Sequence, residues 1–309
     1  MPPLKKLPKN SVHRALNALG DRWGLLIVQE AFIGISQFKD FQSKTGMARS
    51  TLANRLRALV KNGIMELRSQ RPGMARQTYH LTTLGSGLFD SVMLAWGWGV
   101  TWGVANRNMP TALIHTTCGK PMVPQMRCGQ CKGPISLTAC RYKDGPGAGL
   151  GRVQFQRLHR RRSTEGKVHA ADVVDFTGDR WTAMVIATQY FGIHRFDDIQ
   201  NYLGIATNIL ADRLRALEAA GVLERRIYEL VPPRYEYWLT KKGIDTYPHS
   251  LSLMFWGDRW LAGEKASPVH VIHKACGHRL GAVVVCSACQ RPLKVDSVKA
   301  GRFRKLSPS

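Results

Sequence analysis

The residues best suited to chemistry are six of the seven cysteines, which fall into two clusters with a histidine beside each. The clusters are His115-x2-Cys118-x9-Cys128-x2-Cys131 and His273-x2-Cys276-x9-Cys286-x2-Cys289. Two short knuckles separated by a loop supply four nitrogen and sulfur ligands, the set that tetrahedral zinc prefers. We therefore expect two closed, structural zinc sites, one in each cluster, with no open position for catalysis.

The histidine ligands follow from matching the two clusters position by position. His273 matches His115, whereas neither His270 nor His278 has a histidine counterpart. Reduced free thiols or a labile disulfide remain alternatives to zinc at the clustered cysteines. The seventh cysteine, Cys140, has no cysteine counterpart, so we expect no role for it.

The clusters belong to a unit that the chain contains twice. Gly20-Asp21-Arg22-Trp23 recurs as Gly178-Asp179-Arg180-Trp181, and Arg55-Leu56-Arg57-Ala58-Leu59 recurs at residues 213–217. These motifs and the cysteines all repeat at an offset of 158 positions, with no insertion or deletion. The two copies run from about residue 8 to 138 and from about 166 to 296, which indicates duplication of one folded unit.

Each copy is expected to contain short helices, a hairpin and a longer final helix. Apolar residues recur at helical spacing in residues 12–19 and 23–33, and a short helix from residue 36 stops at Gly46. Another helix opens near residue 48 and ends at Gly63. A β-hairpin over residues 64–81 follows, and Thr82 caps a last helix that extends toward residue 105. This order predicts a mainly α fold with small β-hairpins (α+β), namely two winged helix-turn-helix domains, each with a small Cys/His zinc knuckle module.

The helix that begins near residue 48 has one polar face, which fits the DNA major groove, about 12 Å wide. We expect this face and the hairpin arginines to contact phosphates and base edges. In the first copy the expected contacts are Arg49, Ser50, Thr51, Asn54, Arg55, Arg57, Arg68 and Arg76. In the second copy they are Thr207, Asn208, Asp212, Arg213, Arg215, Arg226 and Arg234. The plainer alternative is a solvated helix face beside an ordinary hairpin.

The two expected recognition helices differ in their polar residues. Asp212 stands where the first copy has Asn54. An aspartate repels phosphate but can accept a hydrogen bond from cytosine N4. We therefore predict an operator whose two halves are unlike.

Charge supports a nucleic-acid partner. The 309-residue chain has 45 Lys or Arg and 21 Asp or Glu, a formal net charge of +24, which favours double-stranded DNA. Residues 1–140 contain 18 basic and 5 acidic residues, against 19 and 14 in residues 168–309. We therefore expect the arginines of the first copy to contribute more of the salt dependence of binding than those of the second.

These observations divide the chain into six parts. Winged helix-turn-helix domains occupy residues 8–108 and 166–264, zinc-ribbon-like modules 112–138 and 270–296, a basic glycine-rich linker 139–165, and a basic tail 297–309.

At these motifs the sequence resembles the HxlR-type winged helix-turn-helix transcriptional regulators of bacteria, over about residues 11–90 and 169–248. The hairpin over residues 231–237 is also similar to the wing of that family, whereas residues 73–76 depart from it. The resemblance implies a DNA-binding homodimer, and the tandem copies then imply a pseudo-dimer within one chain; further association of two chains remains open. Many members carry a redox cysteine before the first helix, where this chain has Asn10 and Val168, so we expect no thiol switch of that kind.

A tryptophan stripe recurs in both copies. Trp98 and Trp102 match Trp256 and Trp260, and their spacing places each pair on one helix face. Core packing, or contact between the copies, is the plainer interpretation. The alternative is a pocket for a small apolar or aromatic effector.

We therefore expect a sequence-specific DNA-binding transcriptional regulator with structural zinc, acting as a repressor by occluding a promoter, with activation also open. The alternatives are a non-specific chromosome-associated binder and a zinc-responsive regulator. The sequence contains no phosphate loop and no nucleophile elbow, so we do not expect an enzyme. The apolar stretch over residues 91–105 is too short to span a membrane, and no signal-peptide core follows the N-terminus, so we expect a cytoplasmic, nucleoid-associated protein.

Overall fold

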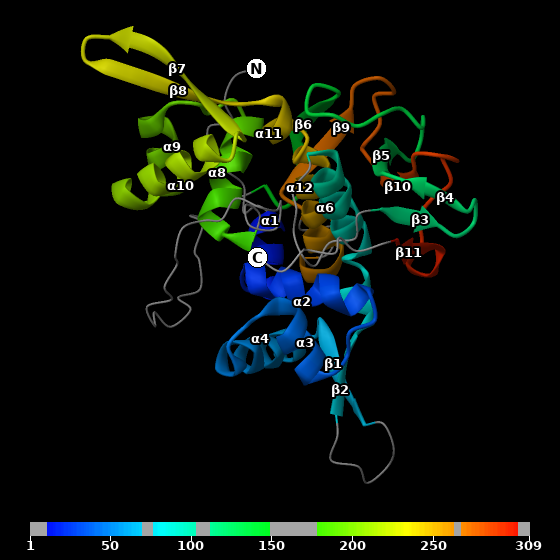
Figure 1. Cartoon of the computed structure of the whole chain (residues 1–309). Coiled ribbons are helices and arrows are strands. Elements are labelled where there is room, and N and C mark those ends of the chain that lie inside the picture. The colour runs from blue at the N-terminus through cyan, green and yellow to red at the C-terminus, as the bar shows by residue number, and fades with distance from the viewer. Residues whose placement is uncertain (1–10, 70–76, 103–111, 149–177, 263–266, 302–309) are drawn as a thin grey trace.

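The computed structural model describes residues 11–69, 77–102, 112–148, 178–262 and 267–301. Figure 1 shows one winged-helix unit at the lower end of the molecule and the other at the upper left, with helices α6 (Phe89–Thr101) and α12 (Tyr247–Gly257) between them. Most strands of the cysteine-containing segments lie on the right, whereas those labelled β6 and β9 lie at the top, near α11 and α12.

The first unit contains the elements that the sequence predicts. They are α1 (Ser11–Leu19), α2 (Arg22–Phe32), α3 (Phe38–Thr45), α4 (Arg49–Lys61), β1 (Met65–Ser69), β2 (Gln77–Leu81) and α5 (Thr83–Ser86). Strands β1 and β2 pair antiparallel, with Met65 opposite Leu81. Leu52, Leu56 and Leu59 form the buried stripe of α4. Burial of each such side chain contributes about 1.5–3 kcal/mol, so this stripe fixes which face of α4 points outward.

The second unit repeats the order. It consists of α8 (Arg180–Tyr190), α9 (Phe196–Leu203), α10 (Thr207–Ala219), β7 (Leu223–Leu230), β8 (Pro233–Leu239) and α11 (Lys241–Ile244), followed by α12 and a π-helical turn, η1 (Asp258–Ala262). Leu210, Leu214 and Leu217 are the buried stripe of α10 and match the three leucines of α4. The two-copy fold is therefore confirmed.

Local chemistry sets the limits of these helices. Asp21 caps α2 by accepting hydrogen bonds from the backbone N–H groups of Trp23 and Gly24. Gly46 ends α3 in the left-handed region, at φ 67°, where a side chain would be strained. Gly204 ends α9 in the same way, at φ 61°. Each glycine makes the turn that leads into α4 or α10.

The final helix differs from the expectation of one continuous element. Thr82 caps only the four-residue helix α5, and α6 begins separately at Phe89. Thr240 and α11 repeat this arrangement before α12. Each hydroxyl donates to a backbone oxygen just beyond the end of α4 or α10, Thr82 to Gly63 at 2.6 Å and Thr240 to Gly221 at 2.6 Å.

The two copies pack about an approximate two-fold axis through α6 and α12. Matched residues meet there, because His249 Nδ1 donates to the Ser91 carbonyl at 2.9 Å, and these positions are 158 residues apart. Contacts off the axis occur twice. Trp98 Nε1 donates to the Lys242 carbonyl at 3.1 Å, and Trp256 Nε1 donates to the Leu84 carbonyl at 3.0 Å. Both indoles thus join one copy to the other.

The amino-terminal helix of the first copy adds to this junction. Helix α1 packs against α12 so closely that a side chain at Gly257 would overlap the Ser11 carbonyl. The Ser11 hydroxyl also donates to buried Asp258 in η1. The Arg180 guanidinium donates to the Gly20 carbonyl at 3.0 Å and ties the two Gly-Asp-Arg-Trp turns together.

The cysteine-containing segments exchange strands between the copies. Their strands are β3 (Leu113–His115), β4 (Lys120–Met122), β5 (Pro124–Cys128), β6 (Cys140–Asp144), β9 (Val269–His273), β10 (Ala282–Cys286) and β11 (Val298–Ala300), with a 3-10 turn η3 (Val295–Ser297). Strand β5 pairs antiparallel with its own counterpart β10, and the matched residues Met126 and Val284 face each other. Strand β11 pairs with β3, and β6 pairs with β9.

Four expectations about this region change as a result. The segments expected as separate modules at 112–138 and 270–296 share their strands. The expected linker starts later, because residues 140–144 form β6, and residues 298–300 of the expected tail form β11. Cys140, expected to be incidental, is buried in β6 opposite His273.

Within the described residues, no helix combines the length and apolar character needed to cross a membrane.

Candidate nucleic-acid interface and metal clusters

Helices α4 and α10 each present a polar face. Figure 1 shows both on the left side of the molecule, with the two hairpins pointing toward opposite ends. On α4 the exposed side chains include Arg49, Ser50, Asn54 and Arg57, and Thr51 is half-buried. On α10 the exposed side chains include Thr207, Asn208, Asp212 and Arg215. These expected contact residues are therefore brought together on one accessible face of each helix.

The charge of the two faces differs. Arg57 donates to the neutral amide oxygen of Asn54 at 3.0 Å, and Arg49 lies over the Phe38 ring at 5.4 Å. Among the described residues neither arginine forms an ion pair with a carboxylate. Arg215, in contrast, forms an ion pair with Asp212 at 2.5 Å. The face of α4 thus carries two uncompensated positive charges, whereas that of α10 carries an internally neutralised pair.

Arg55 and Arg213 are used inside the fold. Arg55 Nη2 lies 2.5 Å from Asp21 Oδ2, and Arg213 Nε lies 2.6 Å from Asp179 Oδ2. Asp179 also caps α8 by accepting from the Thr182 N–H at 2.9 Å. We therefore assign these arginines to the positioning of α4 and α10 rather than to the expected DNA contact. The joint recurrence of the Gly-Asp-Arg-Trp and Arg-Leu-Arg motifs was the signal of this pairing.

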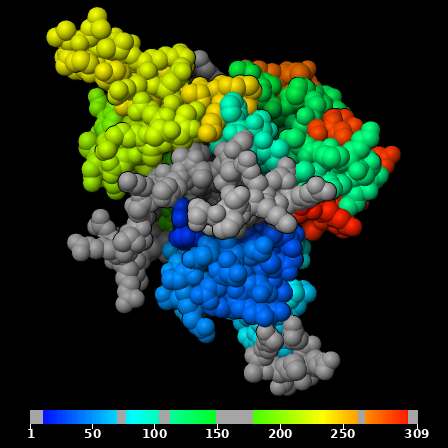
Figure 2. Space-filling model, in the orientation of Figure 1, coloured from blue at the N-terminus to red at the C-terminus, as the bar shows by residue number. Residues whose placement is uncertain are grey.

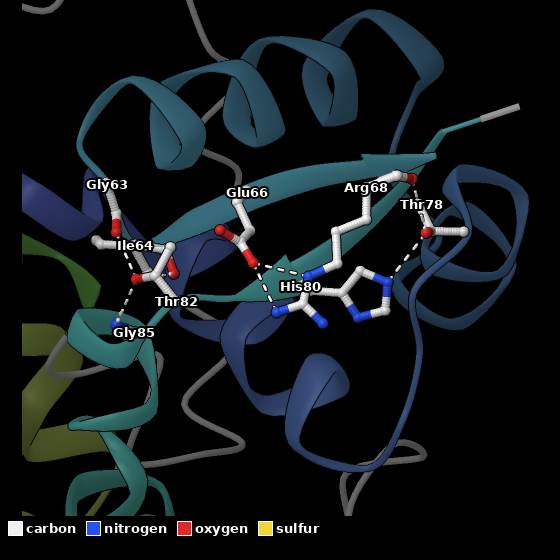
Figure 3. Close-up of polar contacts among 8 residues, drawn as sticks. All are labelled: Gly63, Ile64, Glu66, Arg68, Thr78, His80, Thr82 and Gly85. Atoms are coloured by element: carbon white, nitrogen blue, oxygen red, sulfur yellow. Dashed lines mark hydrogen bonds and ion pairs between the residues drawn. The ribbon is translucent and has the colours of Figure 1, made fainter. Parts of the chain in front are cut away.

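The first hairpin is tied down at its base, as Figure 3 shows. The Thr82 hydroxyl donates to the carbonyls of Gly63 and Ile64 and accepts from the N–H of Gly85. Farther along the hairpin, Arg68 donates to Glu66 Oε1 at 2.7 Å. Arg68 therefore reaches the wing surface as half of an ion pair.

The second hairpin neutralises its arginines in the same manner. Arg226 pairs with Glu224 at 2.6 Å, and Arg234 pairs with Glu229 at 3.3 Å. Both glutamates were missed from the sequence. The Glu-x-Arg spacing of Glu224 and Arg226 places both side chains on one face of a strand, whereas Glu229 faces Arg234 across the hairpin. Arg76, expected in the first hairpin, lies outside the described residues.

The tip of the second hairpin is apolar. Leu230 and Val231 are 73% and 87% exposed. The base of the same hairpin carries stacked rings, with His194 and Trp238 centroids 3.8 Å apart.

The eight expected metal ligands meet in two groups, but not in the expected combinations. One group consists of His115, Cys118, Cys286 and Cys289, and the other of Cys128, Cys131, His273 and Cys276. In each group the ligand atoms lie within 4.8 Å of one another. The expectation that each copy builds its own site is wrong, because the pairing of β5 with β10 carries each Cys-x2-Cys knuckle to the other copy.

The distances between ligand atoms are close to those of a tetrahedral zinc site. Metal–ligand bonds of about 2.3 Å to sulfur and 2.0–2.1 Å to nitrogen imply edges of about 3.8 Å between sulfurs and about 3.6 Å between sulfur and nitrogen. The Cys118–Cys286 and Cys128–Cys276 sulfurs are 3.9 and 3.8 Å apart. Nδ1 of His115 lies 3.5 Å from Cys118 Sγ and 3.2 Å from Cys289 Sγ. The donor set fits zinc.

Backbone N–H groups of the knuckles donate to the cysteine sulfurs. The Ala288 N–H donates to Cys286 Sγ at 3.3 Å, although burial raises the pKa of that thiol. The backbone N–H of Arg291 lowers the pKa of the Cys289 thiol. Lys132 and Gln290 follow the last cysteine of each cluster and have positive φ of 60° and 59°, the conformation of a tight knuckle turn.

The tryptophans divide between two roles. Trp98 and Trp256 join the copies, as the plainer interpretation expected. Trp98 and Trp102 also line a cleft with Met126 and Pro248, and Trp102 Nε1 is buried without a hydrogen-bond partner in the described structure. In the other copy Trp260 instead packs against Gly87.

Two recognition helices, each followed by a hairpin and related by a two-fold arrangement, define a winged helix-turn-helix DNA-binding protein. The HxlR-like helix-turn-helix family matches residues 18–107 and 176–265, and the chain belongs to that family. Its function class is DNA-binding transcriptional regulation.

Similar proteins are regulators of this type. The chain is 35% identical over 125 residues to the uncharacterized HTH-type transcriptional regulator Rv3095 of Mycobacterium tuberculosis, covering 40% of this chain and 79% of that protein. It is 34% identical over 86 residues to the uncharacterized HTH-type transcriptional regulator YtfH of Escherichia coli, covering 28% of this chain and 68% of that protein. Among solved structures, the putative transcription factor PA1607 is 34% identical, with a TM-score of 0.35, over 40% of this chain and 86% of that one.

Proposed function

We propose that the protein is a sequence-specific transcriptional regulator that inserts α4 and α10 into successive major grooves of one operator. The observation that carries the proposal is the exposed polar face of each helix, presented on one side of the molecule by two copies packed about an approximate two-fold axis. Successive major grooves are about 34 Å apart, the spacing that paired recognition helices use. Arg49, Ser50, Thr51, Asn54 and Arg57 then read one half-site, and Thr207, Asn208, Asp212 and Arg215 read the other.

Repression by occlusion of a promoter is the mode of action that we propose, at the nucleoid in the cytoplasm. Each winged-helix unit covers one half-site, so a bound chain covers about two turns of DNA and excludes other proteins from that stretch. Two zinc ions, one in each Cys/His group, complete the protein as structural ions. A small apolar or aromatic effector has one candidate place, the cleft beside Trp98 and Trp102.

A footprinting experiment separates this function from non-specific binding. The zinc-loaded chain is incubated with genomic fragments at about 150 mM salt, where non-specific binding is weakened by competing counterions. We expect protection of a defined sequence about two helical turns long. Protection that is uniform along every fragment, or lost entirely at this salt, refutes sequence-specific recognition and favours a chromosome-associated binder.

A further inference from the structure

The two Cys/His groups are junctions between the copies. Each takes a His-x2-Cys pair from one copy and a Cys-x2-Cys pair from the other. We propose that zinc at these two junctions clamps the copies together and fixes α4 and α10 relative to each other. The inference rests on the proposed function for its DNA consequence, whereas the composition of the metal sites is independent of it.

Backbone pairing supports the exchanged combination independently of any ion. Strand β5 pairs with β10, and the Gly129 N–H donates to the Gly281 carbonyl at 2.6 Å. The last strand of each cysteine-containing segment pairs with the first strand of the other segment. Strand β6 pairs with β9, and β11 pairs with β3. The same exchange thus occurs reciprocally at matched positions. Figure 2 shows the result, with residues from the end of the chain set among those of the first cysteine segment on the right.

The two junctions contact the helices that lie between the two winged-helix units, α6 and α12. A side chain at Gly97, in α6, would approach Pro124 Cδ of β5 to 3.1 Å, so the helix and the strand are in direct contact. Ser287 Oγ accepts from the Val123 N–H at 2.9 Å and links the second copy's knuckle to the start of the same strand. Helix α6 in turn packs on α12. A shift of the knuckles is therefore transmitted to the helices that carry the recognition units.

The winged-helix cores have their own stabilisation. Leu16, Ile27, Leu52 and Leu56 are buried in the first unit, and none of them is a ligand, although the buried core continues through the junction to Cys128 and Cys286. Loss of zinc should therefore leave the recognition units folded but loosen their mutual orientation, which the packing of α6 on α12 then holds. This distinguishes a clamp from a site that is needed to fold each unit.

Paired substitutions test which residues share an ion. In the exchanged arrangement Cys118 and Cys286 belong to one site, so the double variant Cys118→Ser/Cys286→Ser should keep one zinc per chain. Cys118→Ser/Cys128→Ser damages both sites and should keep none. Zinc per purified full-length chain, by elemental mass spectrometry, gives the count, and helical circular dichroism checks the fold. If each copy binds its own ion, the two results are reversed, which overturns the proposal.

A second pair guards against loss of folding at the buried cysteines. Cys131 is exposed, and its sulfur lies 3.2 Å from His273 Nδ1 in the same group. Cys131→Ser/His273→Asn should keep one zinc, and Cys131→Ser/Cys118→Ser, which damages one ligand in each group, should keep none. Retention of one zinc by the latter and none by the former overturns the assignment.

DNA binding tests the clamp. After zinc is removed with a chelator, affinity for a single half-site should change less than about twofold, whereas the advantage of a two-half operator over one half-site should fall about tenfold or more. Equal loss on both DNAs, or no loss on either, contradicts the clamp. If no sequence is preferred even with zinc bound, the proposed function fails, and the zinc counts still decide the composition of the sites.

Discussion

The unequal charge of the two recognition helices leads to a quantitative prediction. Arg49 and Arg57 have no carboxylate partner among the described residues, whereas Arg215 is paired with Asp212. Each phosphate that a free cation neutralises steepens the dependence of log K on log salt concentration by about 0.9. Arg49→Ala/Arg57→Ala should therefore reduce the slope by about 1.8.

The effect is large enough to measure directly. Between 50 and 200 mM salt, a slope difference of about 1.8 corresponds to an affinity loss about 12-fold smaller in the double variant than in the native chain. Fluorescence anisotropy with a labelled operator over this salt range gives the slope. The matched single variants are Arg57→Ala, for which we expect a change of about 0.9, and Arg215→Ala, for which we expect a change near zero.

Two further variants sharpen the comparison. Asp212→Asn removes the partner of Arg215 and should increase the slope by up to about 0.9. Arg55→Ala should leave the slope nearly unchanged, because Arg55 is paired with Asp21 inside the fold. Equal slope changes for Arg57→Ala and Arg215→Ala would refute the assignment of unequal charge to the exposed faces of α4 and α10.

Three predictions concern stability, measured by urea unfolding. Asp179→Ala removes the cap of α8 and the partner of Arg213, and should lower the free energy of unfolding by about 2–3 kcal/mol. The control Asp212→Ala, on the exposed face of α10, should change it by no more than about 0.5 kcal/mol. Equal effects would contradict the positioning role of Asp179. Burial lowers the pKa of His249 to about 4, so the unfolded chain takes up a proton that the buried ring does not, and stability is lost as pH falls from about 6.5 to about 4. The advantage of the native chain over His249→Gln should shrink by on the order of 3 kcal/mol from pH 7 to pH 4, and a difference independent of pH would contradict this. Burial raises the pKa of Glu30 to about 7, and Lys44 lowers it in part. The folded chain therefore holds a proton that the unfolded chain releases, so the contribution of Glu30 to stability is greatest below its ordinary pKa and is lost as pH rises through about 7. Glu30→Gln should therefore be more stable than the native chain at pH 8, by on the order of 3 kcal/mol, with no gain at pH 4; a gain of equal size at both pH values would show that ionisation is not the cause.

The sequence was sufficient for most elements within each winged-helix unit, but not for the break between α5 and α6 or between α11 and α12. Leucines at helical spacing, a glycine before and after α4, and a threonine after the hairpin each act over a few residues, so their effect is visible in one copy alone. The same locality singled out all eight residues of the two Cys/His groups, because knuckle spacing is a local property.

The partners of those ligands were not predictable from spacing. Exchange of β5 and β10 between copies depends on strand pairing across 158 positions, and each copy offers the same ligand types as the other. An exchanged site and a site within one copy therefore have identical sequence patterns. Arg55 illustrates the same limit at shorter range, since an arginine on a polar helix face is equally suited to phosphate and to Asp21.

Selection from randomised DNA with the purified, zinc-loaded chain tests the central claim most directly. Two unlike recognition helices on one chain predict an enriched motif of two different half-sites with centres about 10–10.5 base pairs apart. Selection of a single half-site, of a perfect palindrome alone, or of no sequence above random DNA would contradict the claim.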